Sequence, residues 1–278
     1  MDKKLIFLDI DGTLVAALSS PTRPVKQAIQ QARAKGHLVF LCTGRNLPII
    51  GEDILEIGFD GIIASAGSYV AVGDEVLFDH LLPEELVQEC LTVFHDLGMF
   101  CRIETPEGIY TDPQMEQLLC SATPDPHNSE LIRMQKEIER GISIQKYENY
   151  PQKGAYKLCF TSSNMAAVEK AQASLEDRFE FVVHPYGTGT ACYNGEIIPK
   201  GIDKGMGIAM ICRHYGADLK DTIAFGDSMN DAAMLKRAGL AVAMGNACDE
   251  LKGLADRVCE DVLQDGVFLE LKRMGLCE

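Results

Sequence analysis

The sequence lacks the features that mark membrane, secreted and zinc-binding proteins. No stretch approaches about 18 consecutive apolar residues, so no transmembrane helix is expected. The first residues hold two lysines and a short apolar run that Asp9 interrupts, which does not fit a secretion signal. The ten cysteines form no CxxC pair, and the six histidines have no partner cysteines at zinc-ligand spacing. We therefore expect a cytoplasmic protein with buried, reduced thiols and no zinc site.

Positive charge is scarce in this chain. Lysine and arginine number 26 against 41 aspartates and glutamates, which gives a net charge of −15 at pH 7. Such an acidic chain is a poor candidate for binding nucleic acids or anionic membranes. It also has no P-loop, so a nucleotide-dependent kinase is unsupported. The oligomeric state is not indicated by the composition.

Strand and helix patterns alternate near the start of the 278-residue chain. Residues 5–8, 37–42 and 61–64 are short apolar runs, and helical patterns over 24–35 and 48–57 separate them. Continuously apolar strands that alternate with helices indicate a parallel sheet covered on both faces. We therefore expect an α/β fold for this part.

The middle of the chain has a different pattern. Between residues 83 and 189 the strands alternate polar and apolar residues and the helices are more charged, which is typical of an antiparallel α+β domain. Helices are expected there at residues 84–97, 129–140 and 164–179. The α/β pattern then returns. We predict a Rossmann-like parallel-sheet core from residues 1–82 and 190–278, interrupted by an α+β domain at 83–189.

Polar loops follow three of the predicted core strands. Their chemically important residues are Asp9 and Asp11, Thr43 to Arg45, and Asp227, Asn230 and Asp231. The carboxyl ends of parallel strands share one edge of a sheet, where ligands bind. Carboxylates that converge there repel one another unless a cation lies among them, and oxygen ligands suit Mg²⁺. One such acid alone is typical of a helix cap or turn, but all three loops together indicate a site where an aspartate attacks phosphorus.

Four segments carry a resemblance to a known family. They read Asp9-Ile10-Asp11-Gly12-Thr13-Leu14, Thr43-Gly44-Arg45, Lys204-Gly205 and Gly226-Asp227-Ser228-Met229-Asn230-Asp231. They resemble the four motifs of the haloacid dehalogenase-like hydrolase superfamily. The insertion between the second and third motifs resembles the type IIB cap of the Cof-type phosphatases. The resemblance implies that residues 83–189 form a cap domain and that the protein is a Mg²⁺-dependent phosphatase.

The resemblance also implies a role for each motif residue. Asp9 is the expected nucleophile, and Asp11 is the expected acid and base. The phosphoryl group is expected to contact Thr43, Gly44 and Lys204, and Asn230 is expected either to contact it too or to orient the residues around it. The Mg²⁺ ligands are expected to be Asp9, the backbone carbonyl of Asp11 and Asp227, with Asp231 either ligating the ion or supporting its ligands. Lys200 also precedes a glycine, but the family places its lysine at the start of the helix before the last motif, which favours Lys204.

The expected substrate is a small phosphorylated metabolite, such as a sugar phosphate, a nucleotide-like phosphate or a phosphorylated cofactor. Several polar residues on strands of the inserted domain could contact the leaving group, although such residues are more typical of exposed strand surfaces: Arg102, Glu104, Tyr110, Lys157, His184 and Tyr186. Ser65 stands where family members often carry asparagine, which puts any contact of that amide in doubt. A phosphotransferase or phosphomutase with the same intermediate, and a metabolite-binding regulator without turnover, stay open as alternatives.

Overall fold

The structure is a computed structural model that describes the chain except residues 1–2, 17–18, 116, 118–131, 136–143 and 186–192 and the side chains of His184 and Pro185. The chain divides into two compact units. Unit 1 holds residues 1–45, 50–79 and 202–278, and unit 2 holds residues 46–49 and 80–201. The short excursion at 46–49 was not part of the predicted insertion. Among the described helices, none has the length and apolar character to cross a membrane.

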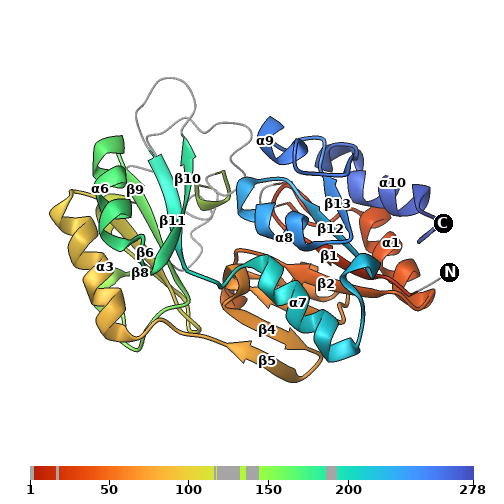
Figure 1. Cartoon of the computed structure of the whole chain (residues 1–278), viewed down its shortest axis with the longest axis horizontal. Coiled ribbons are helices and arrows are strands. Elements are labelled where there is room, and N and C mark those ends of the chain that lie inside the picture. Colours follow the sequence, from red (N-terminus) through yellow and green to blue (C-terminus); the bar gives the residue numbers. More distant parts are fainter. Residues whose placement is uncertain (1–2, 17–18, 116, 118–131, 136–143, 186–192) are drawn as a thin grey trace. The chain divides into compact units, whose positions relative to one another are not determined.

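Unit 1 is built on an eight-stranded sheet. Its strands are β1 (Leu5–Leu8), β2 (Leu38–Cys42), β3 (Gly61–Ala64), β4 (Tyr69–Val72), β5 (Glu75–Asp79), β12 (Thr222–Gly226), β13 (Leu240–Ala243) and β14 (Arg257–Val258). Their order is β14-β13-β12-β1-β2-β3-β4-β5, with β14 to β3 parallel and β4 and β5 antiparallel (Figure 1). The predicted parallel α/β core is confirmed. The β4–β5 hairpin that extends it was not predicted.

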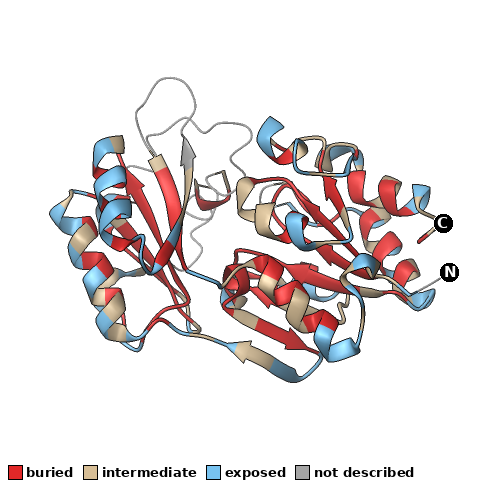
Figure 2. Ribbon diagram, viewed as in Figure 1, coloured by how far each residue is buried: buried red, intermediate tan, exposed pale blue. Residues whose placement is uncertain are grey.

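The helices of unit 1 are α1 (Arg23–Ala34), α2 (Glu52–Leu55), α7 (Lys204–Tyr215), α8 (Ala232–Arg237), α9 (Asp249–Lys252) and α10 (Gly266–Arg273). Helices α1 and α10 pack side by side, as do α7 and α8 (Figure 1). Every residue of β1 is buried (Figure 2). Leu5 and Phe7 join a hydrophobic cluster with Ile208 of α7. The predicted helix at 48–57 is wrong, because Gly51 adopts an extended backbone conformation and only the single turn of α2 follows it.

Unit 2 holds a six-stranded sheet. Its strands are β6 (Phe100–Glu104), β7 (Ile109–Thr111), β8 (Gln145–Lys146), β9 (Lys157–Ser162), β10 (Phe179–Pro185) and β11 (Tyr193–Pro199), in the order β10-β11-β9-β6-β7-β8. All neighbours are antiparallel except β7 and β8. Helices α3 (Glu84–Asp96) and α6 (Met165–Leu175) share a hydrophobic cluster with residues such as Leu158 and Phe160. The predicted α+β character is confirmed, whereas most of the helix expected at 129–140 lies outside the described residues.

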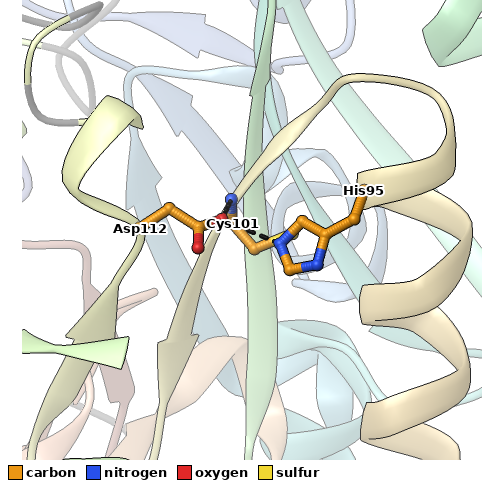
Figure 3. A group of neighbouring side chains, drawn as sticks. All are labelled: His95, Cys101 and Asp112. Carbon is orange, nitrogen blue, oxygen red and sulfur yellow. Dashed lines mark hydrogen bonds and ion pairs between the residues drawn. The ribbon is translucent and has the colours of Figure 1, made fainter. Parts of the chain in front are cut away.

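Three side chains of unit 2 that could hold a metal ion converge near the end of α3: His95, Cys101 and Asp112 (Figure 3). The Asp112 carboxylate oxygen Oδ2 accepts a hydrogen bond from the Cys101 backbone at 2.8 Å and lies 3.0 Å from His95 Nε2. Burial raises the pKa of the Cys101 thiol well above its ordinary value, and a protonated thiol is a poor metal ligand. The contacts account for this carboxylate without a metal. Spacing along the sequence could not have detected the group, because its members come from separate elements.

Candidate active site

Unit 1 gathers three of the predicted site residues at the carboxyl ends of neighbouring strands. Asp9 follows β1, Thr43 follows β2 and Asp227 follows β12. Leu8 of β1 pairs with Phe225 of β12, and the Asp9 backbone N–H donates to the Phe225 carbonyl at 3.1 Å. The strand order β12-β1-β2 therefore places Asp9 between Thr43 and Asp227 along the sheet edge.

The ammonium group of Lys204 lies between two carboxylates. Its Nζ donates to Asp9 Oδ1 at 2.8 Å and to Asp231 Oδ1 at 2.6 Å, and the residue is only 1% exposed. Lys204 is the first residue of α7, which Asp203 caps by accepting a hydrogen bond from the backbone of the helix. Lys200 is exposed. The structure thus brings Lys204 to the predicted nucleophile.

The charges of this cluster shift one another's pKa values. Burial raises the pKa of Asp9 well above its ordinary value and Asp231 raises it further, while Lys204 opposes both effects. Burial alone would lower the pKa of Lys204, but Asp231 and Asp9 outweigh it, so its pKa lies well above the ordinary value. A divalent cation beside Asp9 would lower the pKa of this carboxyl group and favour its ionised form.

The acidic residues fit a hard cation. Asp9, Asp227 and Asp231 are buried, and each offers a carboxylate oxygen within 4.8 Å of the others. Such an all-oxygen donor set suits Mg²⁺. The carboxylate of Asp231 already has hydrogen-bond partners in the protein. Its Oδ2 accepts the N–H groups of Asp227 at 3.0 Å and Ser228 at 3.2 Å, and its Oδ1 accepts a hydrogen bond from Lys204. Both oxygens of Asp231 therefore have protein partners, and this residue is better suited to supporting the loop than to ligating the cation.

Gly12 allows the first and last motifs to approach each other. Its φ is +80°, and a Cβ built on it would collide with the carboxylate of Asp227. Any other residue at this position would adopt an unfavourable backbone conformation, and its Cβ would also clash with the Asp227 carboxylate. Asn246 fixes the same loop, since its amide donates to the Gly12 carbonyl at 2.8 Å and its Oδ1 accepts the N–H of Val262. The structural role of Asn246 was not recognised from the sequence, although it lies in a segment downstream of the last motif.

Replacing Gly12 with Ala is expected to weaken Mg²⁺ binding about tenfold or more, because the added methyl group must displace Asp227. Isothermal titration calorimetry of the purified variant with Mg²⁺ measures this change in affinity. Gly73→Ala is the matched control, because Gly73 also has a positive φ, +53°, but nothing lies within 4 Å of its Cβ position. Equal Mg²⁺ affinities of the two variants would contradict the expected displacement.

Arg45 holds the predicted acid and base. Its Nε donates to Asp11 Oδ2 at 2.7 Å and its Nη2 donates to Asp11 Oδ1 at 2.6 Å, and both residues are buried. Bidentate guanidinium–carboxylate pairs of this kind fix geometry as well as charge. The backbone N–H of Arg45 also donates to Thr43 Oγ1 at 3.1 Å, and Gly44 between them is buried. No chemical role was predicted for Arg45 from the sequence, although its place directly after Thr43 and Gly44 was a signal.

The remaining motif residues lie close by. Asn230 Oδ1 accepts from Ser228 Oγ at 2.8 Å and lies 3.5 Å from Lys204 Nζ. Ser65 and Ala66 have φ values of 49° and 57°. Serine and alanine rarely adopt this left-handed conformation, which asparagine and glycine favour.

Unit 2 carries a cluster of buried charges on one face of its sheet. Arg102, Glu104, Lys157 and Glu196 are all at most 5% exposed. Lys157 Nζ lies 2.5 Å from Glu196 Oε2 and 3.7 Å from Glu104 Oε2, and Arg102 Nε lies 3.2 Å from Glu104 Oε1. The expectation that Arg102, Glu104 and Lys157 are exposed strand residues is therefore wrong. Because each positive charge has a carboxylate partner, the charges can be buried together.

Not every residue suggested for contact with the leaving group lies in this cluster. Tyr110 packs into the hydrophobic core beside α3 and α6 instead. The side chain of His184 and the whole of Tyr186 lie outside the described residues.

Comparison with known proteins agrees with this geometry. A "Putative phosphatase YkrA" of Bacillus subtilis is 29% identical over 283 aligned positions, covering 99% of both chains. An "HMP-PP phosphatase" of Yersinia pseudotuberculosis is 28% identical, covering 90% of this chain and 86% of the relative. The solved structure of BT4131, described as a HAD subclass IIB sugar phosphatase, matches with a TM-score of 0.78 at 27% identity, covering 99% of this chain and 100% of the other. The model of one family matches residues 6–271, and the chain belongs to that family, the haloacid dehalogenase-like hydrolases.

Proposed function

We propose that this protein is a Mg²⁺-dependent phosphatase that hydrolyses small phosphomonoesters through a phosphorylated Asp9. The observation that carries the proposal is the buried Lys204 ammonium held between Asp9 and Asp231 at the carboxyl edge of the core sheet. This arrangement offers a carboxylate nucleophile beside a fixed positive charge, which is what transfer of an anionic phosphoryl group requires.

Two displacements at phosphorus make up the proposed reaction. In the first, a carboxylate oxygen of Asp9 forms a bond to phosphorus while the ester P–O bond breaks, and Asp11 gives a proton to the leaving oxygen. In the second, Asp11 takes a proton from water, whose oxygen bonds to phosphorus while the Asp9–phosphorus bond breaks. Phosphate and free Asp9 result. Thr43, the backbone N–H of Gly44, Lys204 and Asn230 would bind the phosphoryl oxygens.

We propose that Asp9, Asp227 and the backbone carbonyl of Asp11 hold the Mg²⁺ ion, with Asp231 supporting them. The bound ion would supply charge neutralisation between the nucleophile and the phosphoryl oxygens. The buried carboxylates of Asp9 and Asp227 are the feature of the chain that favours this assignment.

For the substrate we propose a small phosphorylated metabolite. The names of the relatives, an HMP-PP phosphatase and a sugar phosphatase, support this class. Unit 2, which contains residues 83–189, would act as the cap. The eight described cysteines are free, which supports a reducing, cytoplasmic location.

Phosphate release from a panel of phosphorylated sugars, nucleotides and cofactors, with Mg²⁺ and with a chelator, tests the proposal. We expect release that requires Mg²⁺, and the ranking of the panel gives the leaving-group class. No release from any compound by folded, Mg²⁺-loaded protein would contradict hydrolysis. A phosphotransferase or phosphomutase would be revealed by turnover only when an organic acceptor is added.

The raised pKa of Asp9 predicts how Mg²⁺ affects stability at different pH. In metal-free protein, stability falls as the pH rises from the ordinary aspartate pKa of about 4 through the raised pKa of Asp9, because the folded state resists ionisation. Mg²⁺ binds the ionised form and offsets this loss. The increase in melting temperature caused by Mg²⁺ should therefore be larger near pH 8 than near pH 5. A thermal melt series measures it, and an increase that shrinks with pH would contradict the assignment.

A further inference from the structure

The Thr43-Gly44-Arg45 motif runs directly into Asn46, where the chain passes from unit 1 to unit 2. Arg45 ends the first segment of unit 1 and grips Asp11 by two short hydrogen bonds. Asn46 begins a four-residue segment that belongs to unit 2. One peptide bond therefore separates the residue that holds the predicted acid and base from a residue of the other unit.

Asn46 is firmly attached to the turn between β6 and β7. It is completely buried, and its Nδ2 donates to the Thr105 carbonyl at 2.8 Å and to the Gly108 carbonyl at 3.3 Å. If the amide were turned by 180°, Oδ1 would face two carbonyl oxygens, and none of the three atoms could donate a hydrogen bond. The two hydrogen bonds therefore determine the orientation of the Asn46 amide. The turn is itself braced, because Thr105 Oγ1 accepts the N–H groups of Glu107 and Gly108 at 3.2 Å.

Arg45 is held along its backbone as well. Its N–H donates to Thr43 Oγ1 at 3.1 Å, and its carbonyl accepts the N–H of Ser65 at 2.8 Å. Asn46 adds the restraint on the other side of the Arg45–Asn46 peptide bond. Since Arg45 engages both carboxylate oxygens of Asp11, proton transfer at Asp11 depends on where this guanidinium group lies.

We propose that Asn46 is a positioning residue that couples the β6–β7 turn of unit 2 to the acid–base group Asp11 through Arg45. Asn46 acts on the placement of Arg45 and does not itself contact the reacting atoms. The inference rests on the proposed function, since it assigns Asp11 to proton transfer to the leaving oxygen. It adds a residue outside the four motifs to the residues on which catalysis depends.

The dependence of kcat/KM on the leaving group tests this role. The kcat/KM value covers only the steps up to phosphoryl transfer to Asp9, in which an alkyl oxygen needs a proton and p-nitrophenolate does not. For Asn46→Ala we expect kcat/KM to fall about tenfold or more with glycerol 3-phosphate and less than about threefold with p-nitrophenyl phosphate. Asn164→Ala is the matched control, because it also removes a side-chain hydrogen bond to a unit 2 backbone group, here at 3.0 Å, and both esters should be unaffected.

A double-mutant cycle shows whether Asn46 acts through Arg45. Arg45→Lys loses the bidentate grip, so Asn46→Ala should cause little further loss of glycerol 3-phosphate turnover in that background. Asn46→Val has no N–H donors, adds no charge to this buried position and leaves less empty space than alanine, and it replaces Asn46→Ala if that variant fails to fold. Equal losses with the two esters, no loss at all, or additive effects of Arg45→Lys and the Asn46 variant would overturn the inference. Absence of phosphate release by the wild type would overturn the proposed function and this inference together.

Discussion

Replacing Asp9 with Asn should lower kcat by a factor on the order of 10⁴ or more, because the amide cannot form the proposed bond to phosphorus. The change is nearly isosteric, so it alters the chemistry of the residue more than its packing. It does weaken the contact with the Lys204 ammonium, which loses one of its two carboxylate partners. Initial rates of phosphate release on the best substrate of the panel measure the effect.

A chemical trap strengthens this test. Acid quenching of the wild-type enzyme during turnover of a ³²P-labelled substrate should leave label on the protein that hydroxylamine removes, as expected for an acyl phosphate. Asp9→Asn should carry no such label. Turnover by Asp9→Asn close to the wild-type rate would exclude Asp9 as the nucleophile, whatever the substrate.

Replacing Lys204 with Ala should damage both activity and stability. The Lys204 ammonium is fully buried between Asp9 and Asp231, so its loss leaves two facing carboxylates without their shared positive charge. We expect kcat to fall about 10²-fold to 10³-fold or more, and the metal-free protein to lose about 3–5 kcal/mol of unfolding free energy. Steady-state kinetics and chemical denaturation in the presence of a chelator measure the two effects.

Lys200→Ala is the matched control for this experiment, because Lys200 is exposed and also precedes a glycine. We expect Lys200→Ala to keep wild-type turnover and stability within about 0.5 kcal/mol. Mg²⁺ should restore part of the stability of Lys204→Ala, since the ion returns positive charge to the same carboxylates. If Lys200→Ala abolished turnover and Lys204→Ala did not, the assignment of the lysine would be wrong.

The core fold and the meeting of the motif residues could be predicted because both follow from local patterns. Short apolar runs such as Leu5–Leu8 that alternate with helical patterns indicate strands buried on both faces, and the polar residues after such strands share one sheet edge. Asp9 and Asp231 lie close together as that reasoning requires, whereas Lys204, whose ammonium group joins them, was predicted only from the resemblance to the family's motifs. The β4–β5 hairpin has no comparable signal, since its last strand is half-exposed and follows a single short turn.

The burial of charge in unit 2 could not be predicted from one strand at a time. Arg102 and Lys157 stand in alternating segments whose polar positions normally face water. Their burial depends on Glu104 and on Glu196, which a different strand supplies. The hydrogen bonds of Asn46 could not be predicted from the sequence either. Its two acceptors are backbone carbonyl groups about 60 residues away, and every residue type has such a group.

The pairing of β1 with both β2 and β12 has a consequence for how the chain folds during synthesis. Leu5 pairs with Leu38 on one side and with Thr222 on the other. One edge of β1 therefore stays unpaired until β12 is synthesised, more than 200 residues later. Unit 2 is nearly continuous, from residue 80 to residue 201, and therefore emerges from the ribosome before β12 does. We therefore expect the inserted unit to fold first on the nascent chain, while the half-finished core keeps an unpaired edge that chaperones can bind.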